Sequence, residues 1–242
     1  MTAAWDSYHV RDFIPFSREV HLRLIERVND AQWPLQLGFI ALGVLAAGFA
    51  VRGRPRRALA LLAPAWGWTA AVFFLQFYSE LTWAGRWFAA GFGLEALFVL
   101  TALPWRSAHR ETTMRFDPTT VAALLLWGGG VILYPLAAPL SGAGWIQSEV
   151  FGVHPAPTAL CTLGLLLVSL RGPWLGVCGW IPLLWCLVEG LVLRHFGLPR
   201  AWALFLGGLI AIGAILFLSM SGKKINDQAG AQHSDAHPFE HQ

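Results

Sequence analysis

The chain has 242 residues, of which 56% are hydrophobic and 13% are charged, with a formal net charge of +3 and a mean hydropathy of +0.53. In soluble domains about a quarter of the residues are charged. The much lower charged fraction here argues against a soluble protein and favours one that crosses a membrane. The basic residues are spread over the loops instead of gathering on one face, which argues against nucleic acid as a partner.

The N-terminal segment, residues 1–32, is too rich in charge to hold the apolar core of a secretory signal. Within it FSREVHLRLIERVND places Phe16, Val20, Leu24 and Val28 at spacings of four residues, with charged side chains between them. This periodicity is typical of an amphipathic helix. We expect it to lie in the outer headgroup layer, or else to be an ordinary exposed helix that packs on a loop.

Seven apolar segments follow, each bounded by charge, proline or glycine. Most of these segments are close in length to the roughly 20 residues that a helix needs to cross the hydrocarbon layer. The sequence therefore predicts an all-α fold, a polytopic membrane bundle of about seven transmembrane helices over residues 33–221. The short fifth segment either spans the membrane or forms a re-entrant hairpin. The segments are residues 33–51, 58–78, 87–105, 119–140, 157–171, 173–193 and 199–221.

The loops differ in their content of lysine and arginine, which predicts the orientation. Ten basic residues fall in the loops of one side, and seven fall in the opposite loops and the N-terminal segment together. By the positive-inside rule the ten are cytoplasmic, so we expect the N-terminus outside and the C-terminus inside. The ten are Arg52, Arg54, Arg56, Arg57, Arg106, Arg110, Arg115, Arg171, Lys223 and Lys224.

One carboxylate, Glu95, lies in the middle of the third segment, in GFGLEALFVL. An ionised carboxylate is costly at that depth and a neutral one still needs a hydrogen-bond partner, so Glu95 must face protein or water. It is either a proton-binding or cation-coordinating group or a structural glutamic acid that bonds a neighbouring helix. Gln76 and Glu80, four residues apart at the end of the second segment, and Glu189 in the sixth are candidates for the same intramembrane polar site.

Other polar residues cluster near the predicted outer ends of the segments. Arg86 opens the third segment, Arg194 and His195 follow the sixth, and Glu149 and His154 lie in the long loop between the fourth and the fifth. They could ring an outer vestibule that leads down to Glu95. The alternative is a set of charges at headgroup level with snorkelling arginines.

The fourth segment, TTVAALLLWGGGVILYPLAAPL, contains Gly128, Gly129, Gly130, Pro135 and Pro139. Proline removes a backbone donor and glycine lowers helix stiffness, so this helix should kink or unwind. Broken helices line substrate paths in transporters. Glycine also permits close packing without such a role, so both interpretations stay open.

The tail, residues 222–242, has almost no apolar residues and is predicted to be a disordered cytoplasmic segment. His233, His237 and His241 recur every four residues and could bind a divalent metal if the tail were helical. Pro238 interrupts that helix, which favours a solvated tail.

Signatures of enzymes are absent from the sequence. There is no HExxH, GxSxG, P-loop or dinucleotide fingerprint, and we expect no cofactor. The three cysteines include no CxxC pair, so neither a disulfide framework nor a zinc site is indicated. The pattern favours a protein that is not an enzyme.

Four stretches carry a resemblance: YHVRDFIPFSREVHLRLIERVNDAQWP, ELTWAGRWFAAGF, EVFGVHPAPTALCTLGLLL and WIPLLWCLVEG. They resemble a family of uncharacterised bacterial polytopic inner-membrane proteins, a domain of unknown function, over most of the chain before the tail. The relatives tend to read FG-x-x-P-C-P-T where this chain has Ala156, which makes a redox role less expected. The resemblance implies a multi-pass protein of the bacterial inner membrane and implies no activity.

Two functions follow from these observations. The first is a small-solute or ion permease in which Glu95 couples or coordinates the transported species and the broken fourth helix lines the path. The second is a non-catalytic accessory or assembly protein that docks a membrane protein partner through its outer loops. Glu95 would then be a structural residue that bonds a neighbouring helix. The lipid bilayer is a partner in both.

Overall fold

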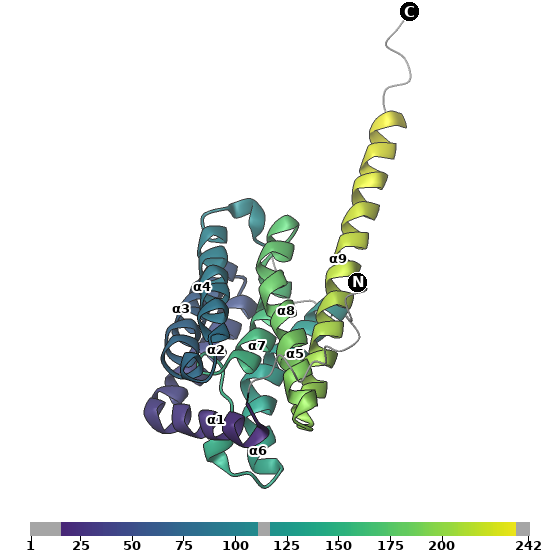
Figure 1. Cartoon of the computed structure of the whole chain (residues 1–242). Coiled ribbons are helices and arrows are strands. Elements are labelled where there is room, and N and C mark those ends of the chain that lie inside the picture. Colours follow the sequence, from purple (N-terminus) through teal and green to yellow (C-terminus); the bar gives the residue numbers. More distant parts are fainter. Residues whose placement is uncertain (1–15, 111–116, 236–242) are drawn as a thin grey trace, which may run out of the picture.

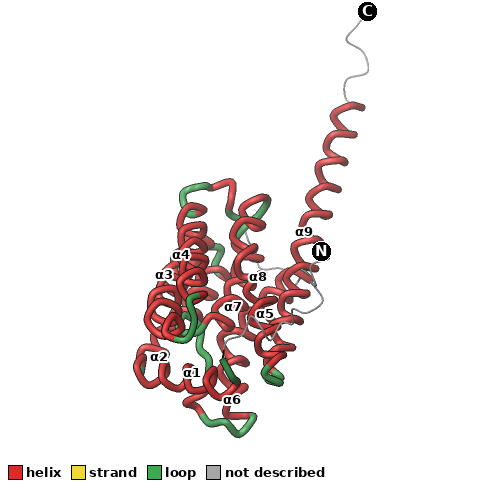
Figure 2. Tube along the Cα trace, viewed as in Figure 1, coloured by secondary structure: helices red, strands yellow, loops and turns green. Residues whose placement is uncertain are grey.

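The computed structural model describes residues 16–110 and 117–235, with side chains described up to residue 221. Across these ranges the chain is helical and forms no β-strand, apart from a single bridge between His109 and Leu170 (Figures 1 and 2). The α-helices are α1 Arg18–Gln32, α2 Leu35–Val51, α3 Pro55–Trp68, α4 Ala84–Ala102, α5 Pro118–Gly128, α6 Tyr134–Leu140, α7 Pro155–Ser169, α8 Pro173–His195 and α9 Arg200–Asp235. Two π-helical segments, η3 Thr69–Phe77 and η6 Gly129–Leu133, and three 3₁₀ turns, η4 Tyr78–Glu80, η5 Arg106–Ala108 and η7 Trp145–Gln147, complete the order.

Helices of membrane-spanning length and apolarity confirm the predicted all-α membrane fold. Within the described residues four helices could cross a membrane: Pro55–Glu80, Pro118–Leu140, Pro173–His195 and Arg200–Ser221. A fifth is added if α1 and α2, which meet at 90°, count as one bent span. Helices α2, α4 and α7 do not reach this length and apolarity on their own. The predicted number of seven transmembrane helices therefore stays a prediction.

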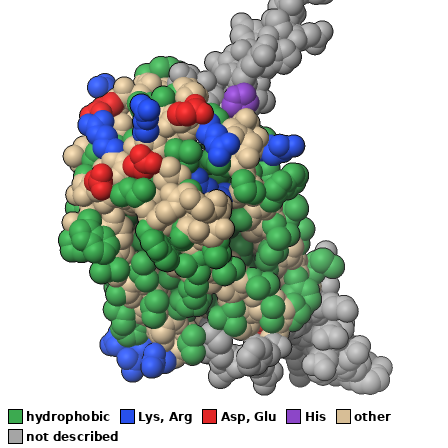
Figure 3. Space-filling model, turned by 90° about the horizontal axis from the view of Figure 1, so that it is seen from below, with side chains coloured by type: hydrophobic (Ala, Val, Ile, Leu, Met, Phe, Trp, Pro, Cys, Tyr) green, Lys and Arg blue, Asp and Glu red, His purple; other side chains and the backbone are tan. Residues whose placement is uncertain are grey.

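The outer surface of the bundle has the distribution of side chains that a bilayer requires. Figure 3 shows charged side chains of both signs at one end, a basic cluster at the other end and hydrophobic side chains between them. Large hydrophobic side chains on the helices, such as Leu97 of α4, Leu125 of α5 and Leu209 of α9, expose between 53% and 66% of their area. In water such a surface would be unfavourable, whereas acyl chains cover it without cost.

Helix α7 lies at the centre of the bundle, and all of its residues are buried. Small residues allow its neighbours to approach closely: a Cβ on Gly164 would lie 2.5 Å from the Ala123 carbonyl oxygen and 2.7 Å from the Trp127 nitrogen. At its C-terminal end the Arg110 amide donates to the Ser169 carbonyl. The α7 helix, which is the fifth apolar segment, therefore runs through the bundle towards the end where residues 106–110 lie.

The predicted interruption of the fourth apolar segment is a π-helical segment instead of an unwound or sharply broken helix. Residues 118–140 form one continuous helical span, in which η6 joins α5 to α6. Pro135 is the second residue of α6, just after η6, where its missing N–H would break the regular α-helical ladder, and a wider turn accommodates it. Gly130 lets α7 approach, because a Cβ there would lie 2.5 Å from the Pro157 carbonyl oxygen.

Helix α1 is the amphipathic helix that the sequence predicts. The Ser17 hydroxyl caps it by accepting from the Val20 amide, and the buried face includes His21, Leu24 and Val28. It lies across one end of the bundle, nearly perpendicular to α2 (Figure 1). At the other end of the chain, α9 continues to Asp235, past residue 222 where the tail is predicted to begin, so the boundary of the tail stays a prediction.

Candidate functional site

Glu95 faces the interior of the bundle. It shares the buried face of α4 with Ala89, Phe92 and Val99, at the spacings of three and four residues that align side chains on one side of a helix. Its side chain is 0% exposed, and both carboxylate oxygens lack a hydrogen-bond partner within the described residues. Cys178 of α8 is close enough to interact with it electrostatically. Glu95 is thus a buried acid with no counter-charge in contact.

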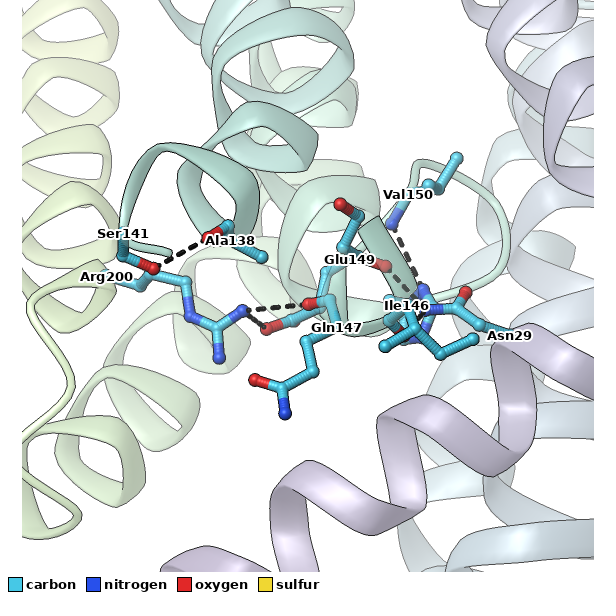
Figure 4. Close-up of polar contacts among 10 residues, drawn as sticks. Asn29, Ala138, Ser141, Ile146, Gln147, Glu149, Val150 and Arg200 are labelled. Atoms are coloured by element: carbon cyan, nitrogen blue, oxygen red, sulfur yellow. Dashed lines mark hydrogen bonds and ion pairs between the residues drawn. The ribbon is translucent and has the colours of Figure 1, made fainter. Parts of the chain in front are cut away.

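A second polar group lies at the end of the bundle that α1 covers, and its centre is an ion pair between Glu149 and Arg200. The Arg200 Nη1 atom lies 2.8 Å from the Glu149 Oε1 atom, and the two side chains are 9% and 2% exposed (Figure 4). The same Nη1 donates to the Gln147 carbonyl at 3.5 Å. Burial raises the pKa of Glu149, and the charge of Arg200 opposes that shift.

Two further helices bring polar side chains to this ion pair. Glu189 of α8 is 7% exposed and lies within electrostatic reach of both Glu149 and Arg200. Tyr134 of α6 is 3% exposed, interacts electrostatically with the same three residues, and has a hydroxyl without a partner in the described part of the chain. We call Tyr134, Glu149, Glu189 and Arg200 the outer cluster. It holds two carboxylates and one guanidinium.

The FGVHPAPT stretch forms the buried wall beside the outer cluster. The Val150 amide donates to His154 Nδ1 at 3.1 Å, and the Thr158 hydroxyl donates to the His154 carbonyl at 2.6 Å while it accepts from the Gly152 amide at 2.8 Å. Gly152 has a φ of +77°, which glycine adopts without strain. His154, at the N-terminal end of α7, is fully buried, and this burial together with the charge of Arg200 lowers its pKa to about 3.

Helix α1 closes this end of the bundle through side chains that bind the loop backbone. The Asn29 amide donates to the Ile146 carbonyl at 2.7 Å and to the Ser148 carbonyl at 2.8 Å (Figure 4). Gln36 in turn donates to the Asn29 carbonyl at 2.8 Å. His21 on the same helix is 3% exposed, and burial followed by the charge of Arg200 lowers its pKa to about 3.

An elongated cavity of about 720 Å³ lies beside the outer cluster, between α1, the span that contains η6, and α9. Its walls are mostly leucine, glycine and alanine, including Gly129 and Leu133 of η6, while Arg18 and Arg200 also line it. The span with the predicted interruption therefore lines a cavity that borders the outer cluster.

The remaining residues of the predicted site lie apart from these groups. Gln76 and Glu80 are exposed, and Glu80 forms a surface ion pair with Arg27 at 2.6 Å. Arg86 and His195 are exposed as well. Arg194 lies over the Trp202 ring at 5.6 Å, as expected for an arginine at headgroup level. The side chains of His233, His237 and His241 lie outside the described residues.

Sequence reasoning missed three residues that the structure places at this end of the bundle: His21, Tyr134 and Arg200. His21 carried a signal, because it lies three and seven residues before Leu24 and Val28 on the apolar face of the amphipathic helix. Arg200 opens the last apolar segment directly after Pro199, where an arginine usually reaches headgroups. Nothing local in the sequence indicates that Arg200 turns inward to Glu149.

The comparisons with known proteins identify the family. Residues 18–224 match the model of a family of unknown function, DUF6064. The chain belongs to this family. The range that matches DUF6064 contains Glu95, the outer cluster and the buried FGVHPAPT stretch. All residues of the candidate site therefore lie within the family match. No curated protein and no solved structure matches the chain.

Proposed function

We propose that this DUF6064 protein is a permease for protons or a small cationic solute, in which buried carboxylates bind the transported species. One observation carries the proposal. The described interior holds three buried carboxylates, Glu95, Glu149 and Glu189, and one guanidinium, that of Arg200, which forms an ion pair with Glu149 and lies within electrostatic reach of Glu189. If all three acids were ionised, the interior would carry two uncompensated negative charges.

The cost of such charges favours the binding of a cation. Moving one ion into a low-dielectric interior costs several kcal/mol even after relaxation. An acid in this position takes up a proton or binds a cation, which removes the net charge. Glu95 has no hydrogen-bond partner in the described residues, and protonation or a bound cation would lower its energy. A group that must gain and release a positive charge is suited to coupling transport.

Helix α8 connects the two acidic sites, because it carries Glu189 and also approaches Glu95 of α4. Glu189 lies near one end of α8, and Cys178, which is within electrostatic reach of Glu95, is eleven residues earlier on the same helix. That separation corresponds to about 16 Å along the helix axis. The cavity lined by η6 borders the outer cluster at Tyr134 and Arg200. The transported charge would bind first at the carboxylates of the outer cluster and then at Glu95, deeper in the bundle.

The membrane arrangement that goes with this function follows the sequence prediction. We place the protein in the bacterial inner membrane with seven spans, the outer cluster and α1 at the outer face, and the arginine-rich turn after α2 in the cytoplasm. The even distribution of charge signs at one end and the basic cluster at the other support this orientation.

Flux measurements in liposomes test the proposal. Purified protein is reconstituted with a pH-sensitive dye inside, and a potassium diffusion potential drives protons inward, with a sodium gradient as the second probe. We expect wild-type protein to carry one of the two fluxes, and we expect Glu95→Gln and Glu189→Gln to reduce it at least about tenfold, as loss of a binding group worth 1.4 kcal/mol or more requires.

The matched control is Glu80→Gln. It removes one carboxylate as well, but from an exposed surface ion pair with side chains that are 49% and 61% exposed. Flux through this variant should equal that of the wild type. Equal flux in all four proteins, above that of empty liposomes, would contradict the assignment of the buried acids.

A second function, an accessory or assembly protein, is favoured by one observation. The end of the bundle near the outer cluster is covered by α1, whose Asn29 is hydrogen-bonded to the loop backbone, and exposed tryptophans such as Trp83 and Trp145 surround it. Such a surface suits a membrane partner. Absence of flux in the wild-type protein, with intact folding, would favour this function.

A further inference from the structure

A second hollow lies at the opposite end of the bundle from the outer cluster, and its walls are basic. It has a volume of about 410 Å³, in the range of sites for small ligands. Two segments far apart in the sequence form it, residues 53–57 at the start of α3 and residues 106–110 after α4. The basic residues that line it are Arg54, Arg56, Arg57, Arg106, His109 and Arg110.

The backbone of this hollow is held in place by hydrogen bonds to neighbouring elements. The Arg56 guanidinium donates to the Pro104 carbonyl at 2.9 Å, which joins the two segments. The Arg171 amide donates to the Ala108 carbonyl at 2.9 Å and the Arg110 amide donates to the Ser169 carbonyl at 3.0 Å, which ties the second segment to the end of α7. The walls are therefore fixed before any ligand arrives, which lowers the cost of binding.

Basic side chains outnumber acidic ones around the hollow. Within the described residues, none of those that line it is acidic. Asp117, outside the lining, lies 3.3 Å from the Arg110 guanidinium and accepts from the Thr120 amide. Arg54 and Arg106 are exposed, and the N-terminal end of α3 at Pro55 adds the partial positive charge of a helix dipole.

One buried side chain helps to hold the wall of the hollow. His109 is 7% exposed, and its Nε2 atom lies 3.1 Å from the Leu103 carbonyl oxygen. This contact ties residue 109 to the C-terminal end of α4.

We propose that this hollow binds a phosphate group, either as the headgroup of an anionic phospholipid in the adjacent leaflet or as free phosphate. Arginine guanidinium groups bind phosphate oxygens with two parallel hydrogen bonds, and the exposed side chains of Arg54 and Arg106 are free to supply them. Basic pockets at the ends of membrane helices bind anionic headgroups by the same chemistry. The site is independent of the permease proposal.

Calorimetric titrations of the full-length protein in non-ionic detergent at low ionic strength test this site. The two probes are a short-chain phosphatidylglycerol and inorganic phosphate. We expect the double variant Arg54→Gln/Arg106→Gln to bind the probe at least about tenfold more weakly than wild type, because two charge-assisted contacts are lost. Both side chains are exposed, so the thermal midpoint should not change.

The matched control is Arg23→Gln/Arg86→Gln, which removes the same charge from exposed positions elsewhere. It should bind the probe as the wild type does. Binding of phosphatidylglycerol alone identifies a lipid as the ligand, and binding of both probes identifies the phosphate group itself as sufficient. Equal weakening in both double variants, or no binding of either probe to wild-type protein, would overturn the proposal.

Discussion

The ion pair between Glu149 and Arg200 gives the sharpest prediction on stability. Its two side chains are 2% and 9% exposed, with 2.8 Å between Oε1 and Nη1. Removing one partner of a buried pair leaves a charge without compensation and costs about 3–5 kcal/mol. For a protein of this size that corresponds to a fall in thermal midpoint of roughly 6–20 °C.

The two single variants should differ, because Glu189 also lies within reach of Arg200. Arg200→Met leaves two buried carboxylates without a cation, whereas Glu149→Leu leaves Glu189 as a carboxylate near the guanidinium. We therefore expect Arg200→Met to be the more destabilising variant. The double variant should regain most of the loss, because apolar groups of similar volume often replace a buried pair without cost.

A surface pair in the same protein is the control. Arg27 and Glu80 are closer, at 2.6 Å, but their side chains are 61% and 49% exposed. Solvent screens them, so their coupling should be about 0–1 kcal/mol. Thermal unfolding in detergent, followed by circular dichroism on both double-mutant cycles, measures the difference. A coupling for Arg27 and Glu80 that equals or exceeds that of Glu149 and Arg200 would refute the reasoning.

Two further predictions concern packing and pH. Gly130→Ala should destabilise the protein by about 1–3 kcal/mol, because the new Cβ would lie 2.5 Å from the Pro157 carbonyl oxygen. Gly129→Ala should not destabilise it, because nothing lies within 4 Å of that Cβ position. The thermal midpoints of the two variants measure the difference. The contribution of His21 and His154 to stability should be level above about pH 6.5 and should fall towards pH 3 by about 1.4 kcal/mol for each pH unit and each histidine. The reason is that both have a pKa of about 3 in the folded protein, whereas a histidine in the unfolded chain binds its proton at a higher pH. Chemical unfolding at several pH values measures this slope, and His154→Gln should reduce it; an unchanged slope would contradict the burial argument.

The sequence predicted the helical fold well because apolar runs of membrane length are set by composition alone. The amphipathic helix α1 was also readable, since Leu24 and Val28 repeat with the helical period. The π-helical form of η6 was not, because glycine and proline indicate that a helix is disturbed without specifying how. The π segment η3 carries neither residue, so nothing in TAAVFFLQF indicates it.

The candidate site was predicted in part. A lone acid such as Glu95 in an apolar run must face inward, and the structure buries it fully. The convergence of Glu149, Glu189 and Arg200 could not be predicted, since it depends on how three elements meet in space. Gln76 and Glu80 share a predicted face, yet both are exposed. Spacing along one helix fixes which side chains align, and it does not say which side of the helix meets the bundle.

The most direct test of the central claim is the ratio of flux through Glu189→Gln protein to flux through Glu80→Gln protein in the same liposomes. Each variant loses one carboxylate, 7% exposed at Glu189 and part of a surface pair at Glu80. If uncompensated interior acids carry the transported charge, this ratio is about one tenth or less. A ratio near one would contradict that claim.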